Sequence, residues 1–379
     1  QIFKNFRLVD QSFSNTISNM AFVVKNGTII WVGPFKKIST EYKKIKQVID
    51  LKNKLVFPSF IECHTHSVFS GSRAEEFELR NQGVSYTEIA QKGGGILSTM
   101  RKTREASTSK LLNLTQDRVN RFVAQGVSTV EIKSGYALDL KNEIKMLEVI
   151  KKINGPQIIS IFLGAHARPP EFSDNTSYLR YLATEVLPVV RKKKLADRVD
   201  IFIENKFFEE TESDEYIKAA KTMGFELTIH ANQLSLSAGV DLALRYKAKS
   251  ADHVIQLNSE VISKIAKSDT VAVLLPMADL YMRCPYPPAR KLIDAGATVA
   301  LATDYNPGSC PSQDLATVGL LARLEMKMTL SEVFKAYTCG AAKALGLQDT
   351  QGKLEVGKWA NFIATEADLT DFFYSAGRT

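Results

Sequence analysis

The sequence predicts an α/β protein, a (β/α)₈ TIM barrel with a small β-sandwich domain built from both chain termini. Between residues 55 and 345, short apolar runs alternate with helical stretches, a pattern typical of parallel strands joined by crossover helices. The stretches before and after this region are rich in strand-forming residues. The length of 379 residues also suits one barrel of typically about 250 residues with an appendage.

Eight apolar runs are candidate barrel strands, and eight parallel strands fit a closed barrel better than an open sheet. They cover residues 55–62, 128–133, 157–163, 199–203, 225–229, 249–252, 270–275 and 297–302. Helical stretches lie between most of them, for example 107–125, 139–153, 177–194, 211–223 and 235–246, and a final helical pair follows at 312–325 and 330–345.

The small domain is expected from the two ends of the chain. Near the N-terminus, Asn26-Gly27 lies between β-rich flanks, which is typical of a type I′ hairpin. The later stretch G-K-L-E-V-G-K-W-A-N-F-I-A-T-E regains β character. We therefore expect residues 1–57 and 346–379 to form the two parts of the small domain, and 58–345 to form the barrel.

Composition restricts the class of protein. A hydrophobic content of 45% is that of a soluble globular chain, and the sequence offers no apolar run of the roughly 20 residues that span a bilayer. The first residues lack the apolar core of a signal peptide. The four cysteines are far apart, which favours a reducing cytoplasm over a disulfide scaffold. The net charge of +8 is dispersed, so we expect neither a membrane nor a nucleic-acid partner.

All five histidines and one aspartate lie where a catalytic site of such a barrel is expected, at the ends of apolar runs. They are His64, His66, His166, His230, His253 and Asp304. A lone histidine beside an apolar run is more often a core or surface residue. The pair in H-T-H differs, because alternation along a strand points both imidazoles to the same side.

His64, His66, His230 and Asp304 together offer three nitrogens and a carboxylate, a suitable ligand set for catalytic zinc or iron. Such a metal lowers the pKa of bound water to about 7. Asp304 can accept the proton of that water and pass it to a leaving nitrogen. Its alternative role is a cap in the turn T-D-Y-N-P-G.

Four further residues are candidates for substrate contacts or catalysis. Of His253 and His166, one can polarise a carbonyl and the other can bind substrate. Arg73 follows the histidine pair in F-S-G-S-R, and a guanidinium binds a carboxylate bidentately. Tyr136 in I-K-S-G-Y offers a hydroxyl. For Arg73 and Tyr136, an ordinary surface position is an equally good interpretation.

The barrel resembles the imidazolonepropionase family of the amidohydrolase superfamily through nearly its whole length. The motifs that carry the resemblance are H-T-H-S-V-F-S-G-S-R-A-E-E-F-E-L-R, Y-T-E-I-A-Q-K-G-G-G-I-L-S-T-M-R-K-T-R, K-S-G-Y-A-L-D, A-H-A, H-A-N-Q-L, A-D-H and T-D-Y-N-P-G-S. The resemblance implies hydrolysis of the cyclic amide C–N bond of 4-imidazolone-5-propanoate to N-formimidoyl-L-glutamate, a step in histidine degradation. It also implies a cytoplasmic homodimer.

The resemblance assigns roles by motif. It implies one divalent metal ion per chain, Zn²⁺ or Fe²⁺/Fe³⁺, held by His64, His66, His230 and Asp304. It implies substrate or product contacts from Arg73, Tyr136, His166, Gln233, Asn306, Gly308 and Ser309, and catalysis by His253, Asp304 and Gln233. A carboxylated-lysine bridge between two ions is not expected, because Lys133 lies on an earlier strand than the usual bridging position.

The sequence departs from the family pattern in places. Glu62 stands where the family usually has an aspartate, and the family allows Glu or Gln at the position of Gln233. The sequence ends at F-F-Y-S-A-G-R-T, before a last strand that the family pattern leads us to expect. Whether Asp304 or His253 moves the decisive proton stays open at this point.

Two other functions compete with this interpretation. A deaminase of a nucleobase or related heterocycle needs a carboxylic acid three residues after the third metal ligand to shuttle protons, but Gln233 offers an amide. A catalytically inactive barrel that serves as a binding module is disfavoured by the full set of ligands. A metal assay discriminates between the second alternative and the enzyme.

Overall fold

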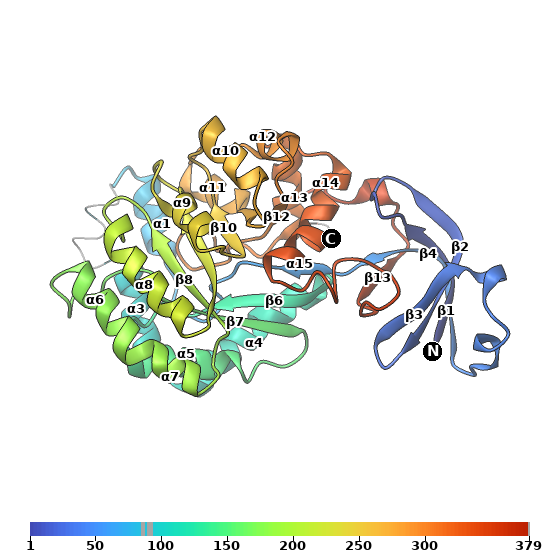
Figure 1. Ribbon diagram of the computed structural model, residues 1–379, viewed down its shortest axis with the longest axis horizontal. Coiled ribbons are helices and arrows are strands. Elements are labelled where there is room, and N and C mark those ends of the chain that lie inside the picture. The colour runs from blue at the N-terminus through green and yellow to red at the C-terminus, as the bar shows by residue number, and fades with distance from the viewer. Residues whose placement is uncertain (85–87, 89–93, 378–379) are drawn as a thin grey trace.

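A computed structural model of the chain describes residues 1–84, 88 and 94–377, and Figure 1 shows a helix-covered barrel with a separate sheet at one end. The predicted fold class is confirmed. The motif Y-T-E-I-A-Q-K-G, from which sequence reasoning drew part of the resemblance, lies outside the described residues except for Glu88. The predicted domain boundaries at residues 57/58 and 345/346 stay a prediction.

The separate sheet combines both ends of the chain, with strand order β13-β4-β1-β2-β3. Its strands are β1 (Ile2–Val9), β2 (Thr16–Lys25), β3 (Thr28–Pro34), β4 (Val48–Pro58) and β13 (Phe362–Thr365). β1 and β4 are parallel, and the other neighbours are antiparallel. Asn26 and Gly27 have φ of 52° and 77° between β2 and β3, the positive values that a type I′ turn requires.

The barrel has eight strands whose hydrogen-bonded neighbours are all parallel. They are β5 (Phe60–Glu62), β6 (Val127–Lys133), β7 (Gln157–Ala165), β8 (Arg198–Ile203), β9 (Glu226–Ala231), β10 (Ser250–His253), β11 (Val271–Leu274) and β12 (Val299–Leu301). The predicted strand 55–62 is divided, because Leu55–Pro58 belong to β4 of the other sheet. The remaining predicted strands are found with ends shifted by one or two residues.

The segments that follow the first and last strands close the barrel. Thr65 forms a parallel bridge with Tyr305, and the N–H of His66 donates to the carbonyl of Tyr305 at 2.9 Å. The N–H of Asp304 donates to the carbonyl of His64 at 3.2 Å. Three of the four predicted metal ligands therefore lie at the seam that closes the barrel.

Helices cover the outside of the barrel (Figure 1). They are α1 (Ala74–Asn81), α3 (Ile96–Glu105), α4 (Thr108–Ala124), α5 (Leu140–Ile150), α6 (Asn175–Tyr181), α7 (Leu187–Lys192), α8 (Glu210–Thr222), α9 (Gly239–Arg245), α10 (Ser259–Ala266), α11 (Pro276–Met282), α12 (Ala289–Asp294), α13 (Leu315–Leu324), α14 (Leu330–Lys335) and α15 (Ala341–Ala344). The predicted helix 177–194 is interrupted by a π-helical turn at Leu182–Val186. Pro188 follows it at the start of α7 and has no N–H to continue the α-helical pattern.

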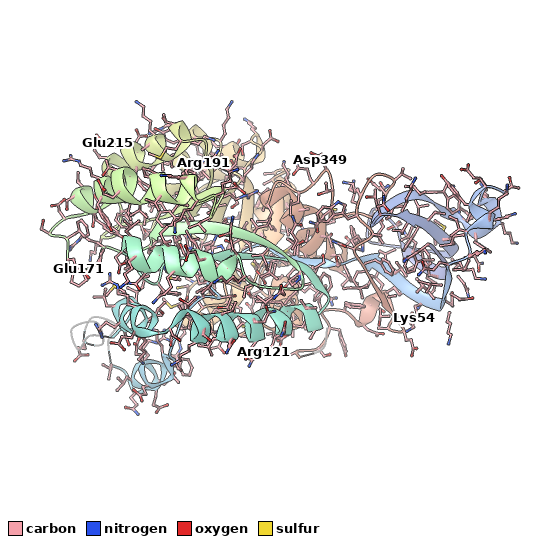
Figure 2. The ribbon with its side chains drawn as sticks, turned by 90° about the horizontal axis from the view of Figure 1, so that it is seen from below. Lys54, Arg121, Glu171, Arg191, Glu215 and Asp349 are labelled. Carbon is pink, nitrogen blue, oxygen red and sulfur yellow. The ribbon has the colours of Figure 1, made fainter. Side chains whose placement is uncertain are left out.

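The exterior carries charges of both signs on every part of the molecule. In Figure 2, Arg121, Arg191, Glu171 and Glu215 project from the helical side, and Lys54 projects from the separate sheet. Within the described residues, no helix combines the length and the apolar character that a membrane span needs.

Candidate active site

Three histidines converge inside the barrel. His64 and His66 follow β5, His230 lies near the end of β9, and one ring nitrogen of each lies within 4.8 Å of the others. The Oδ1 atom of Asp304 lies 3.5 Å from His64 Nε2 and 3.4 Å from His66 Nε2. Three of the four predicted metal ligands therefore form one cluster, and Asp304 lies beside two of them.

The chemistry of this cluster fits one divalent metal ion. His64 Nε2 and Asp304 Oδ1 are buried and have no hydrogen-bond partner among the described residues. Buried polar atoms are rarely left in that state, and three imidazoles with one carboxylate are a ligand set that binds catalytic zinc or iron. Both atoms point to the place where the other ligands converge.

Buried carboxylates orient two of the histidine rings. His64 Nδ1 lies 2.6 Å from Asp252 Oδ2, and His230 Nδ1 lies 3.1 Å from Asp200 Oδ1. Because an ionised carboxylate only accepts hydrogen bonds, each Nδ1 carries a hydrogen, which leaves Nε2 as the ring atom that can bind a metal. The sequence analysis did not identify Asp200 and Asp252 as site residues. The available signal was an acidic residue inside each of the apolar strands V-D-I-F-I and S-A-D-H.

Burial and charge act in opposite directions on the histidines. Burial lowers the pKa of His66 to about 4, so its ring is neutral at pH 7, as ligation requires. Burial and the charge of Lys133 also lower the pKa of His64, but its hydrogen bond to Asp252 and the nearby carboxylate of Asp304 outweigh them and raise the pKa to about 9. Metal binding at His64 therefore displaces a proton.

Glu62 ties the two edges of the closing seam together. Its carboxylate accepts the N–H of His64 at 3.1 Å and the N–H of Thr303 at 3.2 Å. It is fully buried, and burial raises its pKa to about 8. The residue that departs from the family pattern thus holds the backbone beside His64 and Asp304.

A cavity of about 330 Å³ opens above the metal ligands. The predicted site residues that line it are His66, Arg73, Tyr136, His166, His230, Gln233, His253, Asp304, Asn306, Gly308 and Ser309. His64 does not line it and is fully buried. The lining residues that sequence reasoning missed are Arg80, Ile96, Phe202, Phe207, Leu234 and Met282. Arg80 lies within one of the quoted motifs, whereas the apolar residues had no distinguishing signal.

Arg73 lies against Gly308 at the wall of this cavity. Its Nε donates to Glu76 Oε2 at 2.8 Å, and the side chain is 15% exposed. A Cβ placed on Gly308 would come within 2.1 Å of Arg73 Nη1. Only glycine at position 308 allows the guanidinium to lie in this position.

Asn306 organises the turn after β12. Its amide nitrogen donates to the carbonyl of Asp304 at 2.7 Å and to Ser309 Oγ at 2.8 Å. Its amide oxygen accepts the N–H groups of Gly308 at 2.8 Å and Ser309 at 2.7 Å. The side chain that the resemblance assigns to substrate is therefore already engaged in holding the loop that carries Asp304 and Gly308.

His166 and His253 are neutral bases in the cavity wall. His166 Nδ1 lies 3.0 Å from the carbonyl of Gly135, so Nδ1 carries the hydrogen and Nε2 is the acceptor. Burial lowers the pKa of His166 well below its usual value. Burial also lowers the pKa of His253 to about 3, and His253 ends β10 with a φ of 75°, a left-handed conformation uncommon outside glycine.

Comparison with known proteins identifies the family. Residues 55–378 match the family model described as the amidohydrolase family. A curated protein named imidazolonepropionase from Bdellovibrio bacteriovorus is 54% identical and covers 99% of this chain and 89% of its own. This chain belongs to the imidazolonepropionase family. A second curated relative with that name, from Fusobacterium nucleatum, is 41% identical over 94% of this chain and 87% of its own.

Solved structures with low sequence identity share the fold. An adenosine deaminase from Xanthomonas campestris with bound zinc has a TM-score of 0.74 at 16% identity, covering 100% of this chain and 89% of its own. The guanine deaminase of E. coli has a TM-score of 0.72 at 15% identity, covering 96% and 88%. These two likenesses establish the barrel architecture alone.

Proposed function

We propose that this chain hydrolyses the cyclic amide C–N bond of 4-imidazolone-5-propanoate to N-formimidoyl-L-glutamate, a step in histidine degradation. One observation carries the proposal: a single cavity is lined both by three of the four proposed metal ligands, His66, His230 and Asp304, and by Arg73. Such a cavity offers a site for hydrolysis beside a site for a carboxylate tail. Membership of the imidazolonepropionase family supports the same substrate.

The metal would be one Zn²⁺, Fe²⁺ or Fe³⁺ per chain, held by His64, His66, His230 and Asp304. When bound, such an ion lowers the pKa of water to about 7 and provides a nucleophile near neutral pH. The free Oδ1 side of Asp304 lies within this ligand cluster. In this proposal Asp304 accepts the proton of the attacking water and returns it to the leaving ring nitrogen.

The cavity wall would bind and polarise the ring. His253 donates a hydrogen bond to the carbonyl oxygen, where negative charge develops during attack. His166 accepts from a ring N–H, since its Nε2 keeps a lone pair. Arg73 binds the propanoate carboxylate, because charge-assisted hydrogen bonds of a guanidinium are strong and directional. Tyr136 and Gln233 complete the wall that faces the ring.

The turn after β12 would position the substrate's tail. Asn306 fixes the turn through its own amide, so Gly308 and Ser309 present their backbone beside Arg73.

A rival activity, deamination of a nucleobase, receives less support from the site. It requires a carboxylic acid that shuttles protons, and Gln233 supplies an amide.

The wider biological setting is part of the proposal. The substrate is a small molecule, and we place the enzyme in the cytoplasm as a homodimer without a nucleic-acid partner. The dispersed surface charges of both signs agree with the last point (Figure 2).

An absorbance assay tests the activity. Enzymatically generated 4-imidazolone-5-propanoate is mixed with the purified protein, and loss of the imidazolone absorbance is followed with and without a metal chelator. We expect metal-dependent loss and formation of N-formimidoyl-L-glutamate. Ammonia release from cytosine or adenosine by the unmodified protein would instead support the deaminase. A protein that binds metal and turns over none of these compounds would support the inactive binding module.

A further inference from the structure

A buried lysine that the hydrolysis described above does not use lies directly behind the metal ligands. Lys133 ends β6, and its side chain is 0% exposed. Its Nζ lies 3.0 Å from Glu131 Oε1, 3.0 Å from Asp200 Oδ2 and 3.7 Å from Asp252 Oδ2. Each of these carboxylates is at most 1% exposed. One ammonium group therefore joins three buried acidic side chains.

Each of the three carboxylates reaches the metal-binding segment. Asp252 contacts His64 Nδ1 at 2.6 Å, and Asp200 contacts His230 Nδ1 at 3.1 Å. Glu131 accepts the N–H of Thr65, the residue between the two histidines of the pair, at 2.8 Å. Lys133 is thus linked through one carboxylate each to His64, to His230 and to the backbone of Thr65 beside His66.

We propose that Lys133 is a positioning residue, whose buried ammonium anchors Glu131, Asp200 and Asp252 so that His64, His66 and His230 are held ready to bind one metal ion. The proposal rests on the metal site of the proposed function, but not on the identity of the substrate. The reason is physical: buried carboxylates repel one another in a medium of low dielectric, and a cation between them fixes both their charge and their direction. Lys133 does not line the cavity.

The same surroundings oppose a second metal ion at this lysine. Carboxylation of Nζ would replace the ammonium with an anion, and three carboxylates already lie within 3.7 Å. Burial lowers the pKa of Lys133, but the three carboxylates outweigh burial and raise it. The side chain therefore stays charged, and its role is to orient ligands from behind.

The test measures metal binding directly. Metal-free wild type and Lys133→Met are titrated with Zn²⁺ against a chelating dye, and each is then loaded with Co²⁺ for its visible absorption spectrum. We expect Lys133→Met to bind Zn²⁺ about 10- to 100-fold more weakly, the usual cost of losing an outer partner of metal ligands. We also expect an altered Co²⁺ spectrum and, at saturating metal, a lowered kcat with a KM within about twofold of wild type.

Arg198→Met is the matched control. Arg198 is also a buried cation, but it donates to the carbonyls of Ala344 and Leu345 rather than to the three carboxylates around Lys133. The Arg198→Met variant should have a lower melting temperature and an unchanged Zn²⁺ affinity. Equal weakening of Zn²⁺ binding in both variants would refute the proposal, as would unchanged Zn²⁺ affinity and Co²⁺ spectrum in Lys133→Met.

A second variant covers the case in which Lys133→Met does not fold. Glu131→Gln/Lys133→Met removes one charge of each sign, so the interior keeps its net charge. The same 10- to 100-fold loss of Zn²⁺ affinity is expected, and wild-type affinity in this variant would refute the role of Lys133. Absence of Zn²⁺ binding by the wild type would instead contradict the metal site itself, and with it the proposed hydrolysis.

Discussion

Substitution of Gly308 by alanine should impair substrate binding through the displacement of Arg73. The added Cβ would lie 2.1 Å from Arg73 Nη1 and 2.7 Å from Cζ. Non-bonded heavy atoms need about 3.5 Å, so the guanidinium has to move by roughly 1.4 Å. Gly308 is not among the residues with a positive φ, so alanine can adopt its backbone conformation and the turn itself should survive.

The expected magnitude follows from the hydrogen bonds that this movement breaks. A shift of roughly 1.4 Å exceeds the tolerance of a hydrogen bond, whose heavy atoms lie about 2.7–3.2 Å apart. Loss of one bond to a charged group costs about 1.5–3 kcal/mol, which corresponds to about a 10- to 150-fold loss in kcat/KM. Removal of the guanidinium in Arg73→Met should cost about 2–4 kcal/mol.

The assay is a double-mutant cycle on kcat/KM with Gly308→Ala, Arg73→Met and the double variant. If Gly308→Ala acts through Arg73, the double variant should be no worse than Arg73→Met alone. A ring analogue without the propanoate tail should be turned over equally by the wild type and Gly308→Ala. Unchanged kcat/KM in Gly308→Ala, or additive losses in the double variant, would show that Arg73 does not bind the tail from this position.

Three further predictions concern the cluster and its surroundings. His64→Ala or Asp304→Ala should abolish turnover and reduce the metal content, measured by elemental analysis, from about one ion per chain. A variant with wild-type activity and full metal content would show that the substituted residue is not part of the site. Gln233→Glu should keep substantial hydrolysis with a shifted pH profile and gain no deaminase activity; loss of all hydrolysis would show that the amide itself is required. Burial and then the charge of Asp304 raise the pKa of Asp279 to about 8. Folding therefore takes up a proton between its usual pKa of 3.8 and about 8, and stability falls as pH rises through that window. Asp279→Asn should raise the melting temperature at pH 7–8 and weaken this dependence, and an unchanged pH profile of melting would contradict it.

The architecture could be predicted because the barrel strands are apolar runs with helical stretches between them. The run L-V-F-P-S-F-I-E gave one predicted strand, but its residues pair with β13 before Ser59 and with β6 after it. Nothing in a continuous apolar run marks a change of sheet. The short helices α10, α11 and α12, of six to eight residues each, were not among the helical stretches that we named from the sequence.

The convergence of the histidines could be predicted from their spacing and position, whereas the residues that support them could not. In an H-x-H motif on a strand, the alternation of side chains already places both imidazoles on the same face. In contrast, Lys133 entered the sequence analysis only as a residue excluded from bridging two ions. Lys133, Asp200 and Asp252 lie on three different strands. They are therefore close to one another only in the folded barrel. A charged residue in an apolar strand indicates that it has a buried partner, but the sequence does not show which residue that partner is.

The order of the strands in the terminal sheet has a consequence for synthesis of the chain on the ribosome. β4 pairs with β1 on one side and with β13 on the other, and β13 begins only at Phe362. Until β13 emerges, Leu55–Pro58 expose an apolar strand edge that can pair with another nascent copy. A single residue, Ser59, separates this edge from β5, which leads to His64 and His66. The nascent protein thus carries an exposed apolar edge close in sequence to its proposed metal ligands, and a chain truncated before β13 should accumulate as insoluble oligomers even though every barrel strand is present.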